Sequence, residues 1–276
     1  MIKHSSLARI HSVISLSKKI FTLNLECPQI ASIAQPGQFV QLKLPDDQSS
    51  IWPRPFSIHK AADEIVTISI KKFGKITRLL ETLKSGSMIN VTGPLGNSFS
   101  MPPPDREIYF AAGGVGLPPL QFLAEKLLRQ GYPVDKLHFY SGARSAEELF
   151  GDHELQALGL DYVSATDDGT TGIKGYITEP LSVELTRRRT GNEDFIPIIY
   201  GCGPEPMLKK LAAVCYKIPC FLSLEALMPC GWGVCNGCAV KIKKNDNLVT
   251  EDERGFRLAR VCKEGPVFDA SEVIWE

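Results

Sequence analysis

Three of the eight cysteines in this chain lie within nine residues, and a fourth follows them toward the C-terminus. The run reads Cys230-Gly-Trp-Gly-Val-Cys235-Asn-Gly-Cys238, and 23 residues separate Cys238 from Cys262. A C-x4-C-x2-C…C pattern is typical of plant-type [2Fe–2S] sites. The glycines between the cysteines let the backbone curl around such a cluster with its amides directed inward. The sequence therefore predicts a [2Fe–2S] cluster whose ligands are Cys230, Cys235, Cys238 and Cys262.

Two other uses of these thiols are a structural zinc site and a set of disulfides. Structural zinc sites usually show two paired C-x2–4-C or histidine knuckles, and the sequence shows none. Cys235 and Cys238 are too close in the chain to form a disulfide without strain. The identity of the fourth ligand stays open between Cys262 and Cys215 or Cys220, although we expect these last two to pack in the core as small apolar side chains.

Composition narrows the class of protein. At 276 residues, 43% hydrophobic and 22% charged, the chain fits two soluble domains plus a small appendage. Lysine plus arginine equals aspartate plus glutamate, 31 of each, so no overall field favours nucleic acid or an anionic membrane. The start has no basic-then-apolar signal segment, and no apolar run approaches about 18 residues. We therefore expect a cytoplasmic protein that binds neither nucleic acid nor membranes.

Residues 1–101 are dominated by expected strands, with one short helix over 76–83. The strands are β-branched or alternate apolar with polar residues, and they are expected over 8–15, 20–25, 38–44, 56–60, 64–71 and 87–92. Such a series predicts a small antiparallel barrel.

Two motifs in this barrel offer groups for a phosphate-bearing ligand. Arg54-Pro55-Phe56-Ser57 supplies a cation, an aromatic ring and a hydroxyl. The stretch from Lys71 to Thr77 leads into the expected helix, whose first amides can hold a pyrophosphate. Either motif alone is better explained as a strand and turn with two solvated lysines.

From residue 105 to residue 218 strands and helices alternate, which is typical of a parallel α/β sheet. A strand over 108–112 runs into Gly113-Gly114-Val115-Gly116 and a proline-led helix that extends to Arg129. This arrangement presents a helix N-terminus to a dinucleotide pyrophosphate. Further strands are expected over 137–141, 161–165 and 195–200, with a helix through Phe150 after the first of them.

The last of these strands ends in Gly201-Cys202-Gly203-Pro204, where a ligand would meet the carboxyl edge of the sheet. The alternative for Cys202 is a buried cysteine beside a tight turn. Residues 219–276 are expected to hold an amphipathic lead over 221–228 and the cysteine loop. A hairpin of strands 239–244 and 248–250, a polar insertion over 251–258 and a strand over 267–270 complete this segment.

Taken in chain order, the motifs RPFS, GKIT, AAGGVGLPPL, YGCGPEPML and CGWGVCNGC…VCKEGPVF resemble the ferredoxin-reductase superfamily. The resemblance is strongest to the electron-transfer subunits of class 1B dihydroorotate dehydrogenases. It implies an FAD-binding β-barrel (1–101), a Rossmann-like NAD domain (105–218) and a [2Fe–2S] module (219–276). It also implies cofactor-binding roles in two groups, for FAD at Arg54, Pro55, Phe56, Ser57, Ser69, Ile70, Lys71, Gly74, Ile76 and Thr77, and for the nicotinamide nucleotide at Gly113, Gly114, Gly116, Gly201, Gly203 and Pro204.

The chain departs from the family pattern in three places. Ile76 stands where relatives usually have glycine, and the region of Lys71 lacks their arginine. Trp52-Pro53 precedes Arg54 where relatives commonly carry Leu-Arg. The stretch before Cys262 is also longer than expected.

The function implied is electron transfer between a [2Fe–2S] cluster, FAD and NAD(H), because FAD converts between hydride and single-electron chemistry. The implied partner is an FMN-containing subunit that oxidises dihydroorotate, in a heterotetramer. Asp167 and Asp168 favour NAD over NADP, whereas Arg144 favours NADP. Cys202 is expected beside the hydride path in a positional role.

Two alternatives stay open at this point. The first is a subunit of another complex, such as a bifurcating ferredoxin:NADP oxidoreductase, a sulfhydrogenase or a sulfite reductase. The second is a non-catalytic module that senses redox state or binds zinc.

Overall fold

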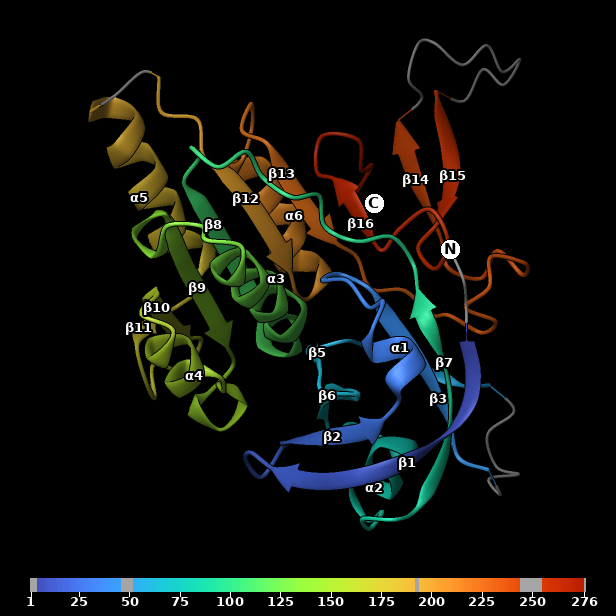
Figure 1. Ribbon diagram of the computed structural model, residues 1–276. Coiled ribbons are helices and arrows are strands. Elements are labelled where there is room, and N and C mark those ends of the chain that lie inside the picture. Colours follow the sequence, from blue (N-terminus) through green and yellow to red (C-terminus); the bar gives the residue numbers. More distant parts are fainter. Residues whose placement is uncertain (1–3, 46–51, 192–193, 244–254, 276) are drawn as a thin grey trace.

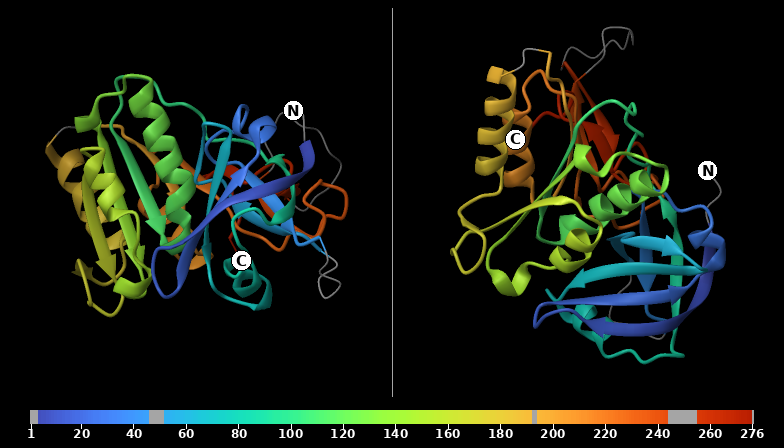
Figure 2. Two further views of the ribbon diagram at one scale, coloured as in Figure 1. Left: turned by 60° about the horizontal axis from the view of Figure 1, so that its bottom comes forward. Right: turned by 60° about the vertical axis from the view of Figure 1, so that its left-hand side comes forward.

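The computed structural model describes residues 4–45, 52–191, 194–243 and 255–275. These residues form two seven-stranded sheets and a two-stranded hairpin. Figure 1 shows the N-terminal sheet, in blue and cyan, below the second sheet, with the hairpin β14–β15 in red beside them. The views in Figure 2 show the same division into an N-terminal barrel and a layered α/β unit.

The N-terminal sheet is antiparallel and follows the order β4-β3-β7-β1-β2-β6-β5. Its core is made by alternate side chains that point into the barrel, such as Leu23, Val40 and Ile68. The elements are β1 (His4–Ser15), β2 (Ile20–Glu26), α1 (Pro28–Ala31), β3 (Phe39–Lys43), β4 (Arg54–Ser57), β5 (Lys60–Ala62), β6 (Ile65–Lys71), α2 (Lys75–Glu81) and β7 (Met88–Leu95).

The strand expected over 56–60 is wrong, because β4 ends at Ser57 and β5 begins at Lys60. The two residues between them close the barrel. The amide of Ile58 donates to the carbonyl of Gln38 at 3.0 Å, and the amide of His59 donates to the carbonyl of Thr67 at 2.9 Å. Because Ile58 and His59 bend the chain and bond to two different parts of the sheet, buried and exposed side chains do not alternate here. A sequence pattern therefore cannot mark the break between the two strands.

The second sheet follows the order β11-β10-β9-β8-β12-β13-β16 and is parallel except for β16, which runs antiparallel to β13. Its central strand β8 is buried on both faces, as expected of a parallel sheet covered by helices. The elements are β8 (Ile108–Gly113), η1 (Gly114–Gly116), α3 (Leu117–Arg129), η2 (Val134–Lys136), β9 (Leu137–Ala143), η3 (Ala146–Glu148), α4 (Asp152–Ala157), β10 (Asp161–Thr166), β11 (Ile173–Lys174), α5 (Thr178–Gly191), β12 (Ile198–Cys202), α6 (Glu205–Val214), β13 (Cys220–Ser223) and β16 (Val267–Asp269).

Two expectations for this part are wrong. The helix through Phe150 is only the single turn η3, and α4 starts after Gly151, whose φ of +80° a β-carbon would disfavour. The amphipathic lead over 221–228 begins as strand β13, which pairs with β12 and β16. The C-terminal segment therefore contributes two strands to the parallel sheet.

The hairpin consists of β14 (Ala239–Lys243) and β15 (Phe256–Arg260). The predicted strand 248–250 lies outside the described residues. Residues 256–258, expected within a polar insertion, belong to β15 instead. Only Ala259 of β15 is fully buried, so the strand carries little hydrophobic pattern.

The three parts share a core where the barrel meets the C-terminal segment. Phe39 of β3 and Leu95 of β7 pack in the same buried cluster as Cys238 and Cys262. The outer face of the barrel strand β3 thus rests against the cysteine-bearing segment. Among the described residues, no helix has the length and apolar character needed to span a bilayer.

Candidate functional site

Cys238 and Cys262 meet at the base of the β14–β15 hairpin. Ala239 pairs with Arg260 across the hairpin, and the amide of Val261 donates to the carbonyl of Cys238 at 3.0 Å. Both thiols are buried, and their Sγ atoms are 3.3 Å apart. Of the 23 residues between these cysteines, β14 and β15 pair with each other next to Cys238 and Cys262, so the long sequence separation does not keep the fourth cysteine away.

The other two cysteines lie in the loop before the hairpin, where backbone amides point at their sulfurs. The amide of Trp232 donates to Cys230 Sγ, and that of Gly237 donates to Cys235 Sγ, each at 3.4 Å. Partial burial works against ionisation of Cys230. Backbone amides, that of Cys235 foremost, outweigh burial and lower the pKa of Cys230 from 9.0 to about 6. The loop is therefore arranged to hold Cys230 as a thiolate, the form in which cysteine binds metals.

The donor set fits a two-iron cluster. The thiols form two pairs, Cys238 with Cys262 and Cys230 with Cys235, which hydrogen-bond to each other. Among the described residues, no three His, Cys, Asp or Glu side chains gather around the position of a single ion. A zinc site needs four ligand atoms around one ion, whereas a [2Fe–2S] cluster offers two irons. All eight cysteines are free thiols, which disfavours the disulfide interpretation.

The two cysteines considered as alternatives to Cys262 for the fourth cluster ligand pack elsewhere. Cys215 and Cys220 are buried and hydrogen-bond to each other at the amino end of β13. They lie in the core as small side chains, as the sequence analysis expected.

Arg260 fastens the cysteine loop to the hairpin, and sequence reasoning missed it. Its guanidinium donates to the carbonyl of Gly233, between the first two cysteines, and to both carboxylate oxygens of Glu264. These hydrogen bonds lower the pKa of Glu264 to about 2, despite its partial burial. Gly233 has a φ of +78°, a conformation that favours glycine. Nothing in the spacing of Arg260 marks it, since its partner lies 27 residues earlier.

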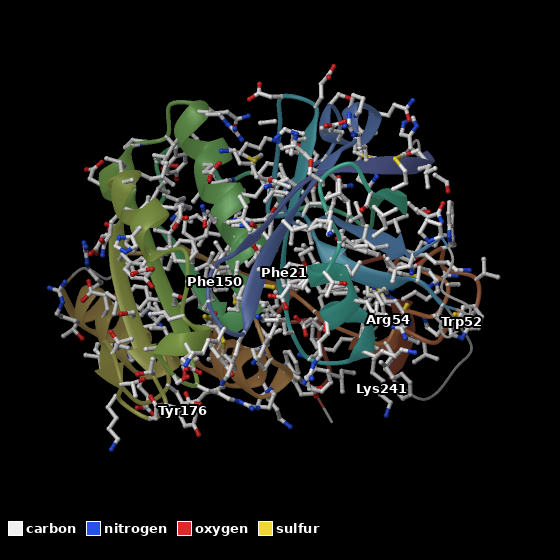
Figure 3. The ribbon with its side chains drawn as sticks, turned by 90° about the horizontal axis from the view of Figure 1, so that it is seen from below. Phe21, Trp52, Arg54, Phe150, Tyr176 and Lys241 are labelled. Carbon is white, nitrogen blue, oxygen red and sulfur yellow. The ribbon has the colours of Figure 1, made fainter. Side chains whose placement is uncertain are left out.

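The motif Arg54–Ser57 forms the edge strand β4 and lies beside β6. Arg54 is exposed and donates to the carbonyl of Trp52 at 2.9 Å, and Figure 3 shows both side chains on the same side of the barrel. Phe56 packs against the barrel core, while Pro55 and Ser57 are half-buried. The cation of Arg54 is thus accessible to a phosphate.

The second group expected to bind FAD lies on β6, where partners within the chain already occupy its side chains. Ser69 Oγ is hydrogen-bonded to His59 Nδ1 at 2.8 Å. Ile70 points into the barrel core, so only its backbone can face a ligand. Lys71 Nζ donates to Glu148 Oε2 at 2.7 Å, and this carboxylate comes from the parallel sheet unit. Sequence reasoning missed Glu148.

At the start of α2, Thr77 serves the helix itself. Its hydroxyl accepts from the amides of Phe73 and Gly74 at 2.9 and 3.0 Å. Gly74 has open space on its side-chain face, and Ile76 is half-buried against the barrel core. The turn therefore keeps an open approach at Gly74.

A cavity of about 500 Å³ lies at the carboxyl ends of the parallel strands. This edge is where open α/β sheets bind their ligands. Of the residues expected to bind cofactors, the cavity is lined by Lys71, Gly113, Gly114, Asp167 and Pro204.

The remaining glycines of the predicted nucleotide site allow close packing of two loops. A β-carbon on Gly116 would collide with the carbonyl of Cys202, and one on Gly203 would come within 3.0 Å of the Gly113 backbone. A β-carbon on Gly201 would press on Leu211 and Leu222. These glycines therefore allow close packing behind the wall of the cavity, and they do not line the cavity themselves.

Cys202 ends β12 with its thiol buried next to this cavity. Burial, followed by the charge of Glu225, raises its pKa well above 9.0, so the thiol stays protonated at neutral pH. A protonated, buried thiol is not a nucleophile. The arrangement agrees with the alternative of a buried cysteine beside a tight turn.

The residues that bear on nucleotide choice follow two neighbouring strands, Arg144 after β9 and Asp167 and Asp168 after β10. Asp167 and Arg144 both line the cavity. Asp168 is committed to its own turn, since its carboxylate accepts from the amide and hydroxyl of Thr170 at 3.0 and 2.6 Å. Of the two aspartates, Asp167 is therefore the one that lines the cavity.

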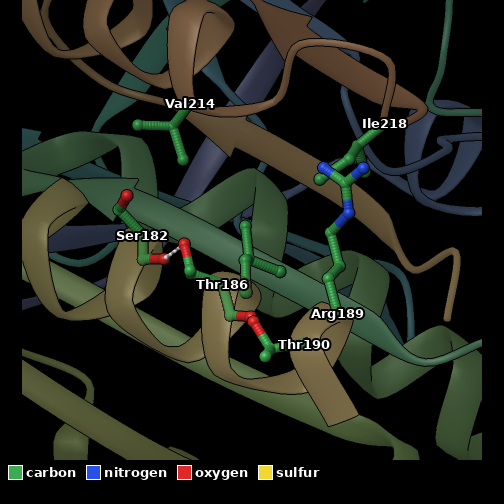
Figure 4. A pocket seen from close by; sticks show the side chains of 7 residues that line it. Ser182, Thr186, Arg189, Thr190, Val214 and Ile218 are labelled. Atoms are coloured by element: carbon green, nitrogen blue, oxygen red, sulfur yellow. Dashed lines mark hydrogen bonds between the residues drawn. The ribbon is translucent and has the colours of Figure 1, made fainter. Parts of the chain in front are cut away.

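A second cavity, of about 380 Å³, lies between α5 and α6 (Figure 4). Two of its hydroxyls are satisfied within α5, because Thr186 donates to the carbonyl of Ser182 at 2.8 Å and Thr190 to that of Thr186 at 2.9 Å. Val214 and Ile218, which also line it, precede β13, so the cavity lies at the amino ends of the strands. It is separate from the cysteines and from the cavity at the carboxyl edge.

Comparison with known families finds matches to three segments of the chain. Residues 7–99 match an oxidoreductase FAD-binding domain, residues 110–213 an oxidoreductase NAD-binding domain, and residues 225–274 the iron–sulfur cluster binding domain of dihydroorotate dehydrogenase B. One similar solved structure is that of an NADH-dependent reduced ferredoxin-NADP oxidoreductase, whose description refers to flavin-based electron bifurcation. It has a TM-score of 0.80 and 25% identity over 98% of this chain and 90% of that chain. A ferredoxin NADP+ reductase from Neisseria gonorrhoeae shares the fold, with a TM-score of 0.64 and 18% identity over 78% of this chain and 91% of that chain.

Curated relatives match over nearly the whole length. The dihydroorotate dehydrogenase B (NAD(+)) electron transfer subunit of Desulforamulus reducens is 32% identical and aligned over 98% of both chains. The protein with the same description from Bacillus velezensis is 35% identical over 96% of both chains. The chain therefore belongs to the family of dihydroorotate dehydrogenase B electron transfer subunits, within the ferredoxin-reductase superfamily.

Proposed function

We propose that this chain carries electrons between NAD(H) and a [2Fe–2S] cluster by way of FAD, as the electron transfer subunit of an assembly that oxidises dihydroorotate to orotate in pyrimidine biosynthesis. The observation that carries the proposal is the arrangement of the four cysteines in two pairs, Cys238 with Cys262 at the base of the hairpin and Cys230 with Cys235 in the loop before it, in a chain that also matches FAD- and NAD-binding domains. FAD supplies the exchange between two-electron hydride chemistry and single electrons.

The contacts described above support a proposal for the residues that hold each cofactor. Cys230, Cys235, Cys238 and Cys262 would bind the cluster, with amides of the loop supporting the first two sulfurs. Arg54 would bind a phosphate of FAD, since its guanidinium is exposed at the barrel edge. Gly114, whose missing side chain faces open space, would allow the nicotinamide nucleotide to approach the backbone.

Asp167 supports NAD as the nucleotide, because a carboxylate accepts from the ribose diol and repels a 2′-phosphate. Arg144 in the same cavity would temper that preference.

A partner is proposed to dock over the cysteine loop. Cys235 is exposed, and Trp232 and Val234 beside it are 42% and 80% exposed. Exposed apolar side chains next to a cluster suit a protein contact through which electrons pass. We propose that the partner is an FMN-containing subunit that oxidises dihydroorotate, and that the assembly is a heterotetramer.

One observation favours a second function. The solved structure of the NADH-dependent reduced ferredoxin-NADP oxidoreductase matches 98% of this chain, so a subunit of a bifurcating complex is the alternative.

Reconstitution with candidate partners distinguishes the two. The chain would be mixed anaerobically with a purified FMN-type dihydroorotate-oxidising subunit, and NADH formation would be followed after addition of dihydroorotate and NAD. The proposal expects NADH formation only with both proteins present. A chain that copurifies with a ferredoxin-linked subunit, and gives no dihydroorotate-dependent NADH, would favour the bifurcating assembly.

A further inference from the structure

Gln41 occupies the junction between the barrel strand that bears the Arg54–Ser57 motif and the cysteine loop. It lies in β3 directly opposite Pro55 of β4, and it is only 2% exposed. Residues directly opposite in an antiparallel pair project to the same face. Gln41 and Pro55 therefore share the outer face of the barrel, together with Phe39 and Ser57 of the neighbouring pair.

The side chain of Gln41 reaches the cysteine loop in two ways. Its Nε2 donates to the carbonyl of Met228 at 3.3 Å, two residues before Cys230. Its amide also lies against Gly231, where an added β-carbon would collide with it. Gly231 has a φ of +68°, so both its conformation and its contact demand glycine.

The amide of Gln41 has one unused group. Because the carbonyl of Met228 can only accept, Nε2 must face it, and this fixes the orientation of the amide. Oε1 then points away, and in the described part of the chain it is buried without a hydrogen-bond partner. A buried acceptor without a donor is unfavourable, so its retention at this junction requires a reason.

We propose that Gln41 is a positioning residue that fixes the cysteine loop against the flavin-binding strand, and thereby sets the rate at which an electron passes between flavin and cluster. The inference rests on the proposed function. The amide holds the backbone on both sides of Cys230, through Met228 and Gly231, while its own strand is paired with the Arg54–Ser57 strand. The unpaired Oε1 shows that this side chain is held at the junction at a cost in hydrogen bonding, which a positioning role explains.

The test replaces Gln41 by methionine, which is similar in length and lacks the amide. Gln41→Asn, which keeps the amide but shortens its reach, is the second variant. The matched control is Gln38→Met, because Gln38 is also 2% exposed and its amide bonds to the Gln35 amide and the Gly96 carbonyl, outside the cysteine loop. Each protein would be mixed with NADH anaerobically, following flavin bleaching by stopped flow and cluster reduction by freeze-quench EPR.

We expect flavin bleaching at the wild-type rate in all variants. Cluster reduction should be slower by about tenfold or more in Gln41→Met, by less in Gln41→Asn, and unchanged in Gln38→Met. The reason is that a displacement of the cysteine loop by about 1 Å can lower the rate of a reaction by a large factor. A further readout is the EPR line shape of the dithionite-reduced cluster, which should change in Gln41→Met at unchanged iron and FAD content.

Wild-type rates of cluster reduction and an unaltered line shape in both Gln41 variants would overturn the inference. Equal slowing in Gln38→Met would also overturn it, since any loss of a buried amide would then suffice. Wild-type protein whose flavin does not bleach with NADH would refute the proposed function instead, and the EPR line shapes would still decide the role of Gln41.

Discussion

Replacing Glu148 by glutamine tests how the barrel is fastened to the parallel sheet unit. The Glu148 side chain is 7% exposed, and its two oxygens accept from Lys71 at 2.7 Å and from Lys19 at 3.1 Å. Burial works against its ionisation, but the hydrogen bonds from these lysines outweigh burial and hold the pKa of Glu148 below 4.5. The two contacts join elements that lie on opposite sides of the junction.

The size of the effect follows from exposure. A hydrogen bond to a charged group contributes about 1.5–3 kcal/mol when buried. Lys71 is 31% exposed and Lys19 42% exposed, and exposed ion pairs contribute at most about 1 kcal/mol. We therefore expect Glu148→Gln to lower the free energy of unfolding by about 1–2 kcal/mol, with Tm falling by about 2–4 °C per kcal/mol.

The assay is urea and thermal unfolding at neutral and acid pH, with Glu147→Gln as the control. Glu147 is 49% exposed, and its contacts to Lys18 and Lys19 are 3.6 and 3.9 Å, so we expect almost no change. Because the folded state depresses the pKa of Glu148, its contribution is present above about pH 4.5 and is lost as the pH falls through the depressed value. Wild type and Glu148→Gln should therefore converge in acid. Equal free energies of unfolding for Glu148→Gln and Glu147→Gln at pH 7 would refute the reasoning.

Three further changes test the site. Gly116→Ala should destabilise the protein by about 3 kcal/mol or more and lower NADH affinity, because its β-carbon would meet the Cys202 carbonyl. The control is Gly191→Ala, where the added β-carbon faces open space. It should change neither the free energy of unfolding nor the NADH titration. Cys262→Ser should abolish the cluster's EPR signal, whereas Cys215→Ser should leave it intact, and the reverse result would move the fourth ligand. Asp167→Asn should narrow the ratio of flavin reduction rates with NADH and NADPH, and an unchanged ratio would remove Asp167 from nucleotide choice.

The local parts of the site could be read from the sequence. The C-x4-C-x2-C spacing places three thiols in one loop whatever the surrounding fold. The strand, glycine turn and proline-led helix at residues 108–129 are likewise consecutive, and the structure has them as β8, η1 and α3. Such features depend on neighbours in the chain, which periodicity and turn residues report.

The contacts that assemble the site are not local, and the sequence does not mark them. Gln41 meets Met228 across 187 positions, and Lys71 meets Glu148 across 77. β15 went unrecognised because its exposed residues hide the alternation that defines a strand. Ser69 and Thr77, expected to bind FAD, make hydrogen bonds within the protein that only the fold reveals.

The central claim is tested most directly by titrating the isolated chain with NADH under strictly anaerobic conditions, after assays of iron, sulfide and FAD. The account predicts two irons and two sulfides per chain, bleaching of the flavin on the first additions, and then the EPR signal of a reduced [2Fe–2S] cluster. A protein that contains zinc in place of iron, or whose reduced flavin never passes an electron to the cluster, would contradict it.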